Sequence, residues 1–131
     1  MDKLLDNQRC FVCGKKNPSG LSIDFEINSQ ERSIRATYTP AHFFQGFEGI
    51  VHGGILSTLL DEAMAKLAFT LGHQVMTAEM TVKFKAPART GEEISISGRL
   101  TQETRRLILA EAKIERGTIV IAEATGKLLR I

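Results

Sequence analysis

The sequence predicts an α+β domain in which an antiparallel sheet of about six strands wraps around one long central helix. Only the stretch from Gly54 to about Leu71 repeats its apolar residues at helical spacing. The segments on either side of it alternate apolar and polar residues, as half-buried strands do. Short turns with polar residues or glycine separate these segments, which favours antiparallel neighbours in the order β-β-α-β-β-β-β.

The predicted helix has a broad apolar face and a defined end. Gly72 follows the last apolar residue and is typical of a helix C-terminus. The face is wider than a helix lying on one surface needs, so we expect the sheet to curl around it. Its members are Ile55, Leu56, Leu59, Leu60, Ala63, Met64, Leu67, Ala68 and Leu71.

Two strands are predicted before the helix and four after it. Residues 21–28 and 33–40 alternate and pair around a short polar turn, and Pro40 ends the second strand. Residues 41–51 carry glycines and aromatic side chains and are expected to form an ordered loop, a kind of segment that often carries function. The strands after the helix are expected within residues 76–88, 91–104, 106–117 and 118–131.

Length and composition bound the class of protein. The 131 residues suit a single domain, residues 1–131, which begins with a turn-rich segment at 1–20. A formal net charge of +2 is too small to indicate a nucleic-acid partner. The sequence has no apolar run long enough to cross a membrane and no secretory signal at its N-terminus, so we expect no membrane contact and a cytoplasmic location.

The only two cysteines, Cys10 and Cys13, have the spacing of half a zinc site. The three histidines are not spaced to complete it, and a thioredoxin-type redox pair would need a βαβ context. We therefore expect two reduced thiols in a turn-rich segment, with no resident metal and no cofactor. A metal shared across a symmetric dimer is the alternative.

Two adjacent acids border the apolar face of the predicted helix on opposite sides. Glu62 has Lys66 four residues further on, which is the favourable arrangement for an ion pair on a helix. Asp61 has Ala65 at that spacing, and aspartate is a poor residue for the middle of a helix. We therefore expect Glu62 to pair with Lys66 and Asp61 to have a role other than helix stability.

The helix begins with His52-Gly53-Gly54, where free N–H groups and the helix dipole favour negative charge. Because glycine lets an acyl group come close to the backbone, an amide here could hold the oxyanion of a tetrahedral intermediate. Gly53 and Asp61 lie about 12 Å apart along one helix, too far for both to reach one oxygen atom. A symmetric dimer would bring Gly53 of one chain to Asp61 of the other.

The stretch "GIVHGGILSTLLDEAMA" resembles the hotdog-fold acyl-CoA thioesterases, in particular the PaaI-like branch. "TAEMTVKFKAPARTGEEI" and the N-terminal "CFVCGKKNPSGL" extend the resemblance, and the order of elements matches over nearly the whole chain. The resemblance implies hydrolysis of a CoA thioester to the free acid and coenzyme A. It also implies a homodimer or homotetramer with active sites between subunits.

The resemblance further implies roles for individual residues. Asp61 is the general base or the nucleophile, and the Gly53 amide is the oxyanion donor. Thr77 helps to place the water, Gln45 contacts the thioester or orders the site, and His52 shapes the site of the substrate carbonyl. Basic side chains that can meet the phosphates of coenzyme A, or else form a solvated strand face, are Lys83, Lys85, Arg89, Arg105 and Arg106.

Three alternatives stay open at this point. The fold can serve an acyl-CoA-binding regulator without catalysis, although about 20 residues before the first strand are too few for a helix-turn-helix. A hydratase of the same fold, acting on an enoyl-CoA, would use His52 and Glu62. For the acyl chain, Phe43, Phe44 and Phe47 either line an aryl or medium-chain pocket or belong to the core.

Overall fold

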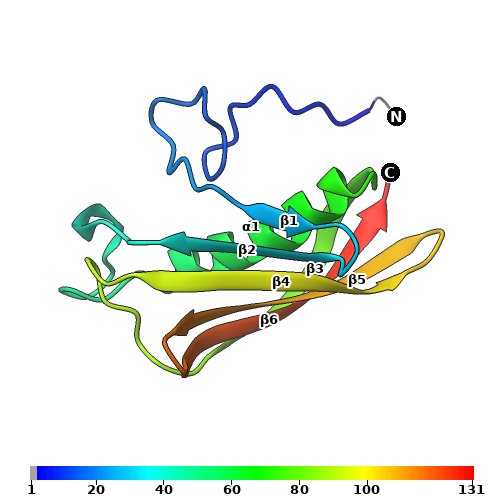
Figure 1. Ribbon diagram of the computed structural model, residues 1–131. Coiled ribbons are helices and arrows are strands. Elements are labelled where there is room, and N and C mark those ends of the chain that lie inside the picture. Colours follow the sequence, from blue (N-terminus) through cyan, green and yellow to red (C-terminus); the bar gives the residue numbers. More distant parts are fainter. Residues whose placement is uncertain (1–2) are drawn as a thin grey trace.

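The long helix is present as α1, Gly53–Thr70, in the computed structural model, which describes residues 3–131. Seven residues of the predicted apolar face are buried, while Ile55 and Leu71 at its edges are partly buried. The helix contacts strands on both halves of the sheet, from β2 to β6, so the sheet surrounds it as the broad apolar face predicted. Figure 1 shows the sheet curving around α1.

The sheet has six strands in the order β1-β2-β4-β5-β6-β3, and every neighbouring pair is antiparallel. The three long C-terminal strands β4, β5 and β6 form a meander, and β3, which follows the helix, pairs only with β6. The predicted α+β architecture is therefore confirmed. The strands are β1 Glu26–Asn28, β2 Ser33–Tyr38, β3 Val75–Phe84, β4 Ile94–Glu103, β5 Leu107–Arg116 and β6 Ile119–Arg130.

The first strand is much shorter than predicted. Residues 21–25 keep the expected alternation of burial, with Ile23 buried, but they are not part of the sheet. The Leu21 and Ile23 N–H groups instead donate to the carbonyls of Phe11 and Val12. The prediction of a strand over 21–28 was wrong at its start because the N-terminal segment takes these backbone hydrogen bonds.

The N-terminal segment runs over the side of α1 that faces away from the sheet (Figure 1). Val12 is 2% exposed and anchors this segment in the core. Two loop contacts fix its path: the Leu4 N–H donates to Gln74, and the Gly14 N–H closes a turn onto the Cys10 carbonyl. The helix is thus covered from two sides. Within residues 3–131, no helix is long and apolar enough to cross a membrane.

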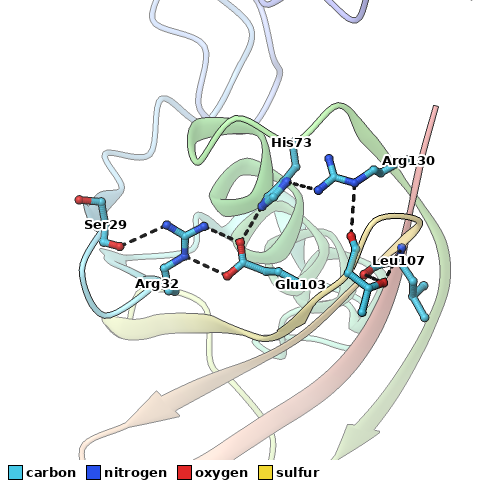
Figure 2. Close-up of polar contacts among 7 residues, drawn as sticks. Ser29, Arg32, His73, Glu103, Leu107 and Arg130 are labelled. Atoms are coloured by element: carbon cyan, nitrogen blue, oxygen red, sulfur yellow. Dashed lines mark hydrogen bonds and ion pairs between the residues drawn. The ribbon is translucent and has the colours of Figure 1, made fainter.

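A polar network joins the C-terminal end of α1 to the sheet (Figure 2). Glu103 at the end of β4 accepts hydrogen bonds from the Arg32 guanidinium and lies 2.7 Å from His73 Nε2. The other ring nitrogen of His73 lies 2.8 Å from Arg130 at the end of β6. The Arg32 hydrogen bonds are the main reason that the pKa of Glu103 falls from 4.5 to about 2, with a smaller contribution from His73.

Candidate functional site

Asp61 and Thr77 are in direct contact. The Thr77 hydroxyl donates to Asp61 Oδ1 at 2.6 Å, and both side chains are half-buried. A bond of this length is typical of a hydroxyl donating to a carboxylate. The carboxylate that had no partner within the helix therefore has one on β3, and its second oxygen remains available for further contacts.

A β-bulge in β3 gives Thr77 this orientation. The register between β3 and β6 shifts between Thr77 and Glu79. Beyond the bulge Met80 and Val82 pack against the core, whereas before it Val75 and Thr77 have the inward position. Because successive residues of a strand point to opposite faces, an unbroken strand that buried Met80 and Val82 would turn Thr77 away from the helix. The extra residue places the hydroxyl opposite Asp61.

The first turn of α1 leaves one backbone donor free. His52 is the N-cap, and its Nδ1 accepts the Gly54 N–H at 2.8 Å. The next two amides, of Ile55 and Leu56, donate to the His52 carbonyl. Among residues 3–131 no acceptor is present for the Gly53 N–H, the only one of these amides left open. Because His52 accepts the N–H groups of Gly54, Ile55 and Leu56, the Gly53 N–H is the donor of this turn that remains free for a ligand.

Phe84 forms a wall beside this free amide. A Cβ atom at position 53 would lie 3.5 Å from the edge of the Phe84 ring, which is ordinary van der Waals contact. The ring is 55% exposed at the end of β3. An aromatic ring half open to solvent next to a free N–H suits a ligand with a carbonyl group and an apolar body.

Residues 48–123, more than half of the chain, match the Thioesterase superfamily. The chain belongs to this family of hydrolases. The family predicted from the HGG-to-aspartate stretch is therefore confirmed, and the sheet wrapped around one helix is its hotdog fold.

One curated protein and two solved structures are similar to the chain. Acyl-coenzyme A thioesterase THEM4 of Bos taurus is 28% identical over 133 residues, which cover 99% of this chain and 54% of that protein. The E. coli PaaI protein superposes with a TM-score of 0.78 at 22% identity, covering 85% of this chain and 80% of that one. A hypothetical thioesterase of Streptococcus pneumoniae, solved with coenzyme A, gives 0.75 at 18% identity and coverages of 82% and 86%. The chain spans about half the length of the curated relatives it matches.

The loop before the helix lies against the start of α1. The Gln45 side chain accepts the Gly49 N–H at 3.0 Å and so orders the loop around itself. The loop also places Gly46 against His52.

The aromatic side chains of this loop were predicted to line a pocket or to belong to the core. Phe43 and Phe47 are 87% and 86% exposed, so neither belongs to the core.

The five predicted CoA-binding side chains do not form one cluster. Lys83 and Lys85 lie at the end of β3 and Arg89 in the loop after it, whereas Arg105 and Arg106 form the turn between β4 and β5. The strand register places that turn beside the start of β3, at the opposite end of the sheet. Lys85 pairs with Glu123 at 3.0 Å, and all five are exposed. One phosphate group cannot meet both sets within one chain.

A cavity on the outer face of the sheet lies away from Asp61. It measures about 740 Å³ and is lined by outward-facing side chains of the sheet, among them Lys83, Arg99 and Glu111. Neither Asp61, Thr77 nor Gly53 contributes to it. This cavity is therefore not the candidate site. The site is identified by the chemistry of Asp61, Thr77 and Gly53 and not by cavity volume.

The predicted ion pair between Glu62 and Lys66 is wrong. In the part of the chain that the structure describes, the two side chains make no ion pair; Glu62 Oε1 lies 3.5 Å from Cys10 Sγ, and Lys66 Nζ lies 3.5 Å from Cys13 Sγ. Both side chains instead contact cysteines of the N-terminal segment. Burial is the main cause that raises the pKa of the Cys13 thiol to about 12, and the Glu62 carboxylate adds to it.

Proposed function

We propose that the chain hydrolyses an acyl-CoA thioester to the free acid and coenzyme A. The observation that carries the proposal is the Asp61 carboxylate held by Thr77, on the same helix as the free Gly53 N–H, in a domain of the thioesterase superfamily. Hydrolysis of a thioester needs an activated water or a nucleophile and a donor for the developing oxyanion. These residues supply both.

Asp61 takes a proton from water as the water adds to the thioester carbonyl. Alternatively it attacks that carbonyl itself, and a water then hydrolyses the resulting mixed anhydride, which releases the free acid and regenerates the carboxylate. The Gly53 N–H donates to the oxyanion, which then collapses and expels the thiolate of coenzyme A. Thr77 holds one carboxylate oxygen and leaves the other for the water. His52 preserves the free amide by capping Gly54, and Gln45 orders the preceding loop.

The relatives support this assignment. THEM4 is named an acyl-coenzyme A thioesterase, and the S. pneumoniae protein was solved with coenzyme A. That S. pneumoniae thioesterase was also solved with one aspartate and, separately, one threonine replaced by alanine, at positions 16 residues apart. Asp61 and Thr77 have the same separation of 16. The shared spacing supports a joint role for these two residues in our chain.

The site is completed by a second copy of the chain. Eight residues of helix, about 12 Å, separate Gly53 from Asp61, so one thioester cannot meet both within one chain. Strand β3 has one edge paired with β6 and its other edge unpaired among the described residues. Pairing of two such edges would place two α1 helices side by side, each with its N-terminus toward the other's Asp61. We therefore assign a homodimer, or a homotetramer built from two such dimers.

The test is hydrolysis of a panel of acyl-CoA thioesters. Turnover is measured by the release of the free thiol of coenzyme A. Asp61→Asn keeps the shape of the side chain and is expected to lower kcat about 10²–10⁴-fold, the usual contribution of a general base. Asp24→Asn, at an exposed aspartate, is the matched control and should leave kcat unchanged. Full turnover by Asp61→Asn would refute the assignment.

The two alternatives of the same fold are separated by the same assay. Tight acyl-CoA binding by the wild type without release of thiol would indicate a regulator. A hydratase would need His52 and Glu62 at one substrate, but His52 caps the helix start and Glu62 turns toward Cys10. Water addition to an enoyl-CoA, measured by loss of its conjugated absorbance, should therefore be absent.

Two groups of basic residues are candidates for the CoA phosphates, and the assay distinguishes them. Lys83, Lys85 and Arg89 lie at the same end of the sheet as the Gly53 amide, because Phe84 of β3 lies beside that glycine. Arg105 and Arg106 lie instead at the end of the sheet where β3 begins, the end that carries Thr77. Arg89→Gln tests the first group and Arg105→Gln the second. The variant in the group that contacts coenzyme A should have a raised KM and an unchanged kcat, and the other variant should change neither.

A further inference from the structure

Three side chains that are far apart in the sequence meet between the N-terminal segment and α1. The Cys10 and Cys13 sulfurs and one Glu62 carboxylate oxygen all lie within 4.8 Å of one another. None is fully exposed, and neither cysteine is in a disulfide. The acid and the two sulfurs come from segments about 50 residues apart, so the cluster exists only in the folded chain.

One carboxylate oxygen of this cluster lacks a hydrogen-bond partner among the described residues. Glu62 Oε2 is buried and, among the described residues, has no hydrogen-bond partner, although buried polar atoms are normally satisfied. Its other oxygen has only a weak thiol donor, Cys10 at 3.5 Å. The Lys66 ammonium lies 3.5 Å from the Cys13 sulfur and, among residues 3–131, forms no ion pair with the acid. An ionised carboxylate in these surroundings would be stabilised by a cation.

The geometry matches a small tetrahedral ion. Zinc binds thiolate sulfur at about 2.3 Å and carboxylate oxygen at about 2.0 Å, which in a tetrahedron puts sulfur and oxygen about 3.5 Å apart. Cys10 Sγ and Glu62 Oε1 lie at that separation. The turn of Cys10-Phe11-Val12-Cys13 is closed by the Gly14 N–H on the Cys10 carbonyl, which directs both sulfurs to one side.

We propose that Cys10, Cys13 and Glu62 bind one Zn²⁺, with water in the fourth position. Two thiolates and a carboxylate carry three negative charges, and Zn²⁺ together with the Lys66 ammonium carries three positive ones. Two sulfur ligands favour zinc over magnesium or calcium, and the hard carboxylate disfavours Cu⁺. The sequence pattern provides two ligands, Cys10 and Cys13, and the fold brings Glu62 to them as the third.

The ion would have a structural role. Glu62 and Asp61 are neighbours on α1 and therefore point in directions about 100° apart, Asp61 toward β3 and Glu62 toward the N-terminal segment. A metal at Glu62 does not touch Thr77 or the thioester. It would fasten residues 10–13, which belong to no helix or strand, to the middle of α1.

The first test measures metal in the wild-type chain. Full-length protein, purified under reducing conditions without a metal-affinity tag, is expected to carry about one zinc per chain by elemental mass spectrometry. After the metal is removed, added Co²⁺ should produce the absorption of thiolate-to-cobalt charge transfer in the near ultraviolet. These readouts do not depend on thioester hydrolysis, so they stand or fall separately from the proposed activity.

The second test uses variants of the ligands. Cys10→Ser, Cys13→Ser and Glu62→Gln should each weaken zinc binding by more than about tenfold in competition with a chromophoric chelator, since even outer contacts of a metal site are worth that much. Glu93→Gln, at an exposed glutamate, should bind zinc as the wild type does. Circular dichroism verifies that each variant is folded.

Two results would overturn the metal site as a whole, and a third would overturn the assignment of Glu62 as a ligand. One is wild-type protein that, freed of metal, takes up neither Zn²⁺ nor Co²⁺ more tightly than a Cys10→Ser, Cys13→Ser double variant. The other is a Cys10–Cys13 disulfide in the reduced preparation with no metal bound. Zinc affinity unchanged in Glu62→Gln would refute the third ligand.

Discussion

Replacing Gly53 by proline removes the proposed oxyanion donor and leaves the helix intact. Gly53 is the first residue of α1, the position at which helices best accept proline, because its N–H has no partner inside the helix. Proline also restricts the residue before it to extended conformations, and His52 already has φ −60° and ψ 134°. The Gly54 amide and its His52 cap are untouched.

The expected effects on stability and on activity have opposite signs. The fixed φ of proline reduces the freedom of the unfolded chain, so the free energy of unfolding should stay constant or rise by about 0.4–1 kcal/mol. The loss of one oxyanion donor should lower kcat about 10²–10³-fold, equivalent to about 2.7–4 kcal/mol of transition-state stabilisation.

The assay is steady-state thioester hydrolysis with thermal unfolding on the same samples. Gly53→Ala is the control: it keeps the N–H and adds a Cβ that would lie 3.5 Å from the Phe84 ring, in ordinary contact. We expect the alanine variant to keep most of its kcat. Equal kcat values for the proline and alanine variants would refute the role of the amide, and a change confined to KM would indicate steric exclusion instead.

Three further predictions concern the residues around the site and the network at its far end. Thr77→Val should lower kcat about 10–150-fold with KM unchanged, because a hydrogen bond to a charged group contributes about 1.5–3 kcal/mol, and Thr77→Ser should restore the activity. Mixed dimers of Asp61→Asn and Gly53→Pro chains should regain up to one working site per dimer if the two groups come from different subunits, whereas a site within one chain would stay inactive. Glu103→Gln should lower the free energy of unfolding by about 1 kcal/mol at pH 7, since solvent screens this partly exposed carboxylate. The folded-state pKa of Glu103 is depressed from 4.5 to about 2, so its stabilisation is present above about pH 4.5 and is lost as the pH falls toward 2. Urea titrations should thus show the difference between Glu103→Gln and wild type shrinking over that range, and a constant difference would contradict the ion-pair explanation.

The local pattern predicted the helix and the six strands because their burial follows their period. The nine apolar residues of the helix face all pack against the core in the structure. Strand β1 was predicted too long because alternation reports which side of a segment is buried, not which backbone receives its hydrogen bonds. Residues 21–25 bury Ile23 against the core while bonding to the N-terminal segment.

The bulge in β3 could not be predicted from periodicity, although the sequence carries a trace of it. Val75 and Thr77 have odd positions, and Met80 and Val82 have even ones, so the inward side changes parity within one strand. A single alternating pattern over residues 76–88 hides that change. The contact between Thr77 and Asp61 depends on it, which is why only the family resemblance, and not the spacing, pointed to Thr77.

The two adjacent acids show the limit of local reasoning most clearly. The i to i+4 rule ranks Lys66 as the partner of Glu62, and on an isolated helix that ranking holds. In the folded chain the pair would be worth only about 0.3–0.5 kcal/mol, so a competing tertiary contact displaces it easily. Cys10 and Cys13 provide that contact from more than 50 residues away.

Adjacent positions on α1 thus serve two different sides of the molecule. Asp61 is held by β3, and Glu62 is held by the N-terminal segment, about 100° further around the helix. A rotation of α1 that moved Asp61 away from Thr77 would also pull Glu62 away from the cysteines. Each contact therefore opposes the motion that would break the other. The cysteine segment, which touches no part of the proposed reaction, helps in this way to keep the Asp61 carboxylate where a thioester would meet it.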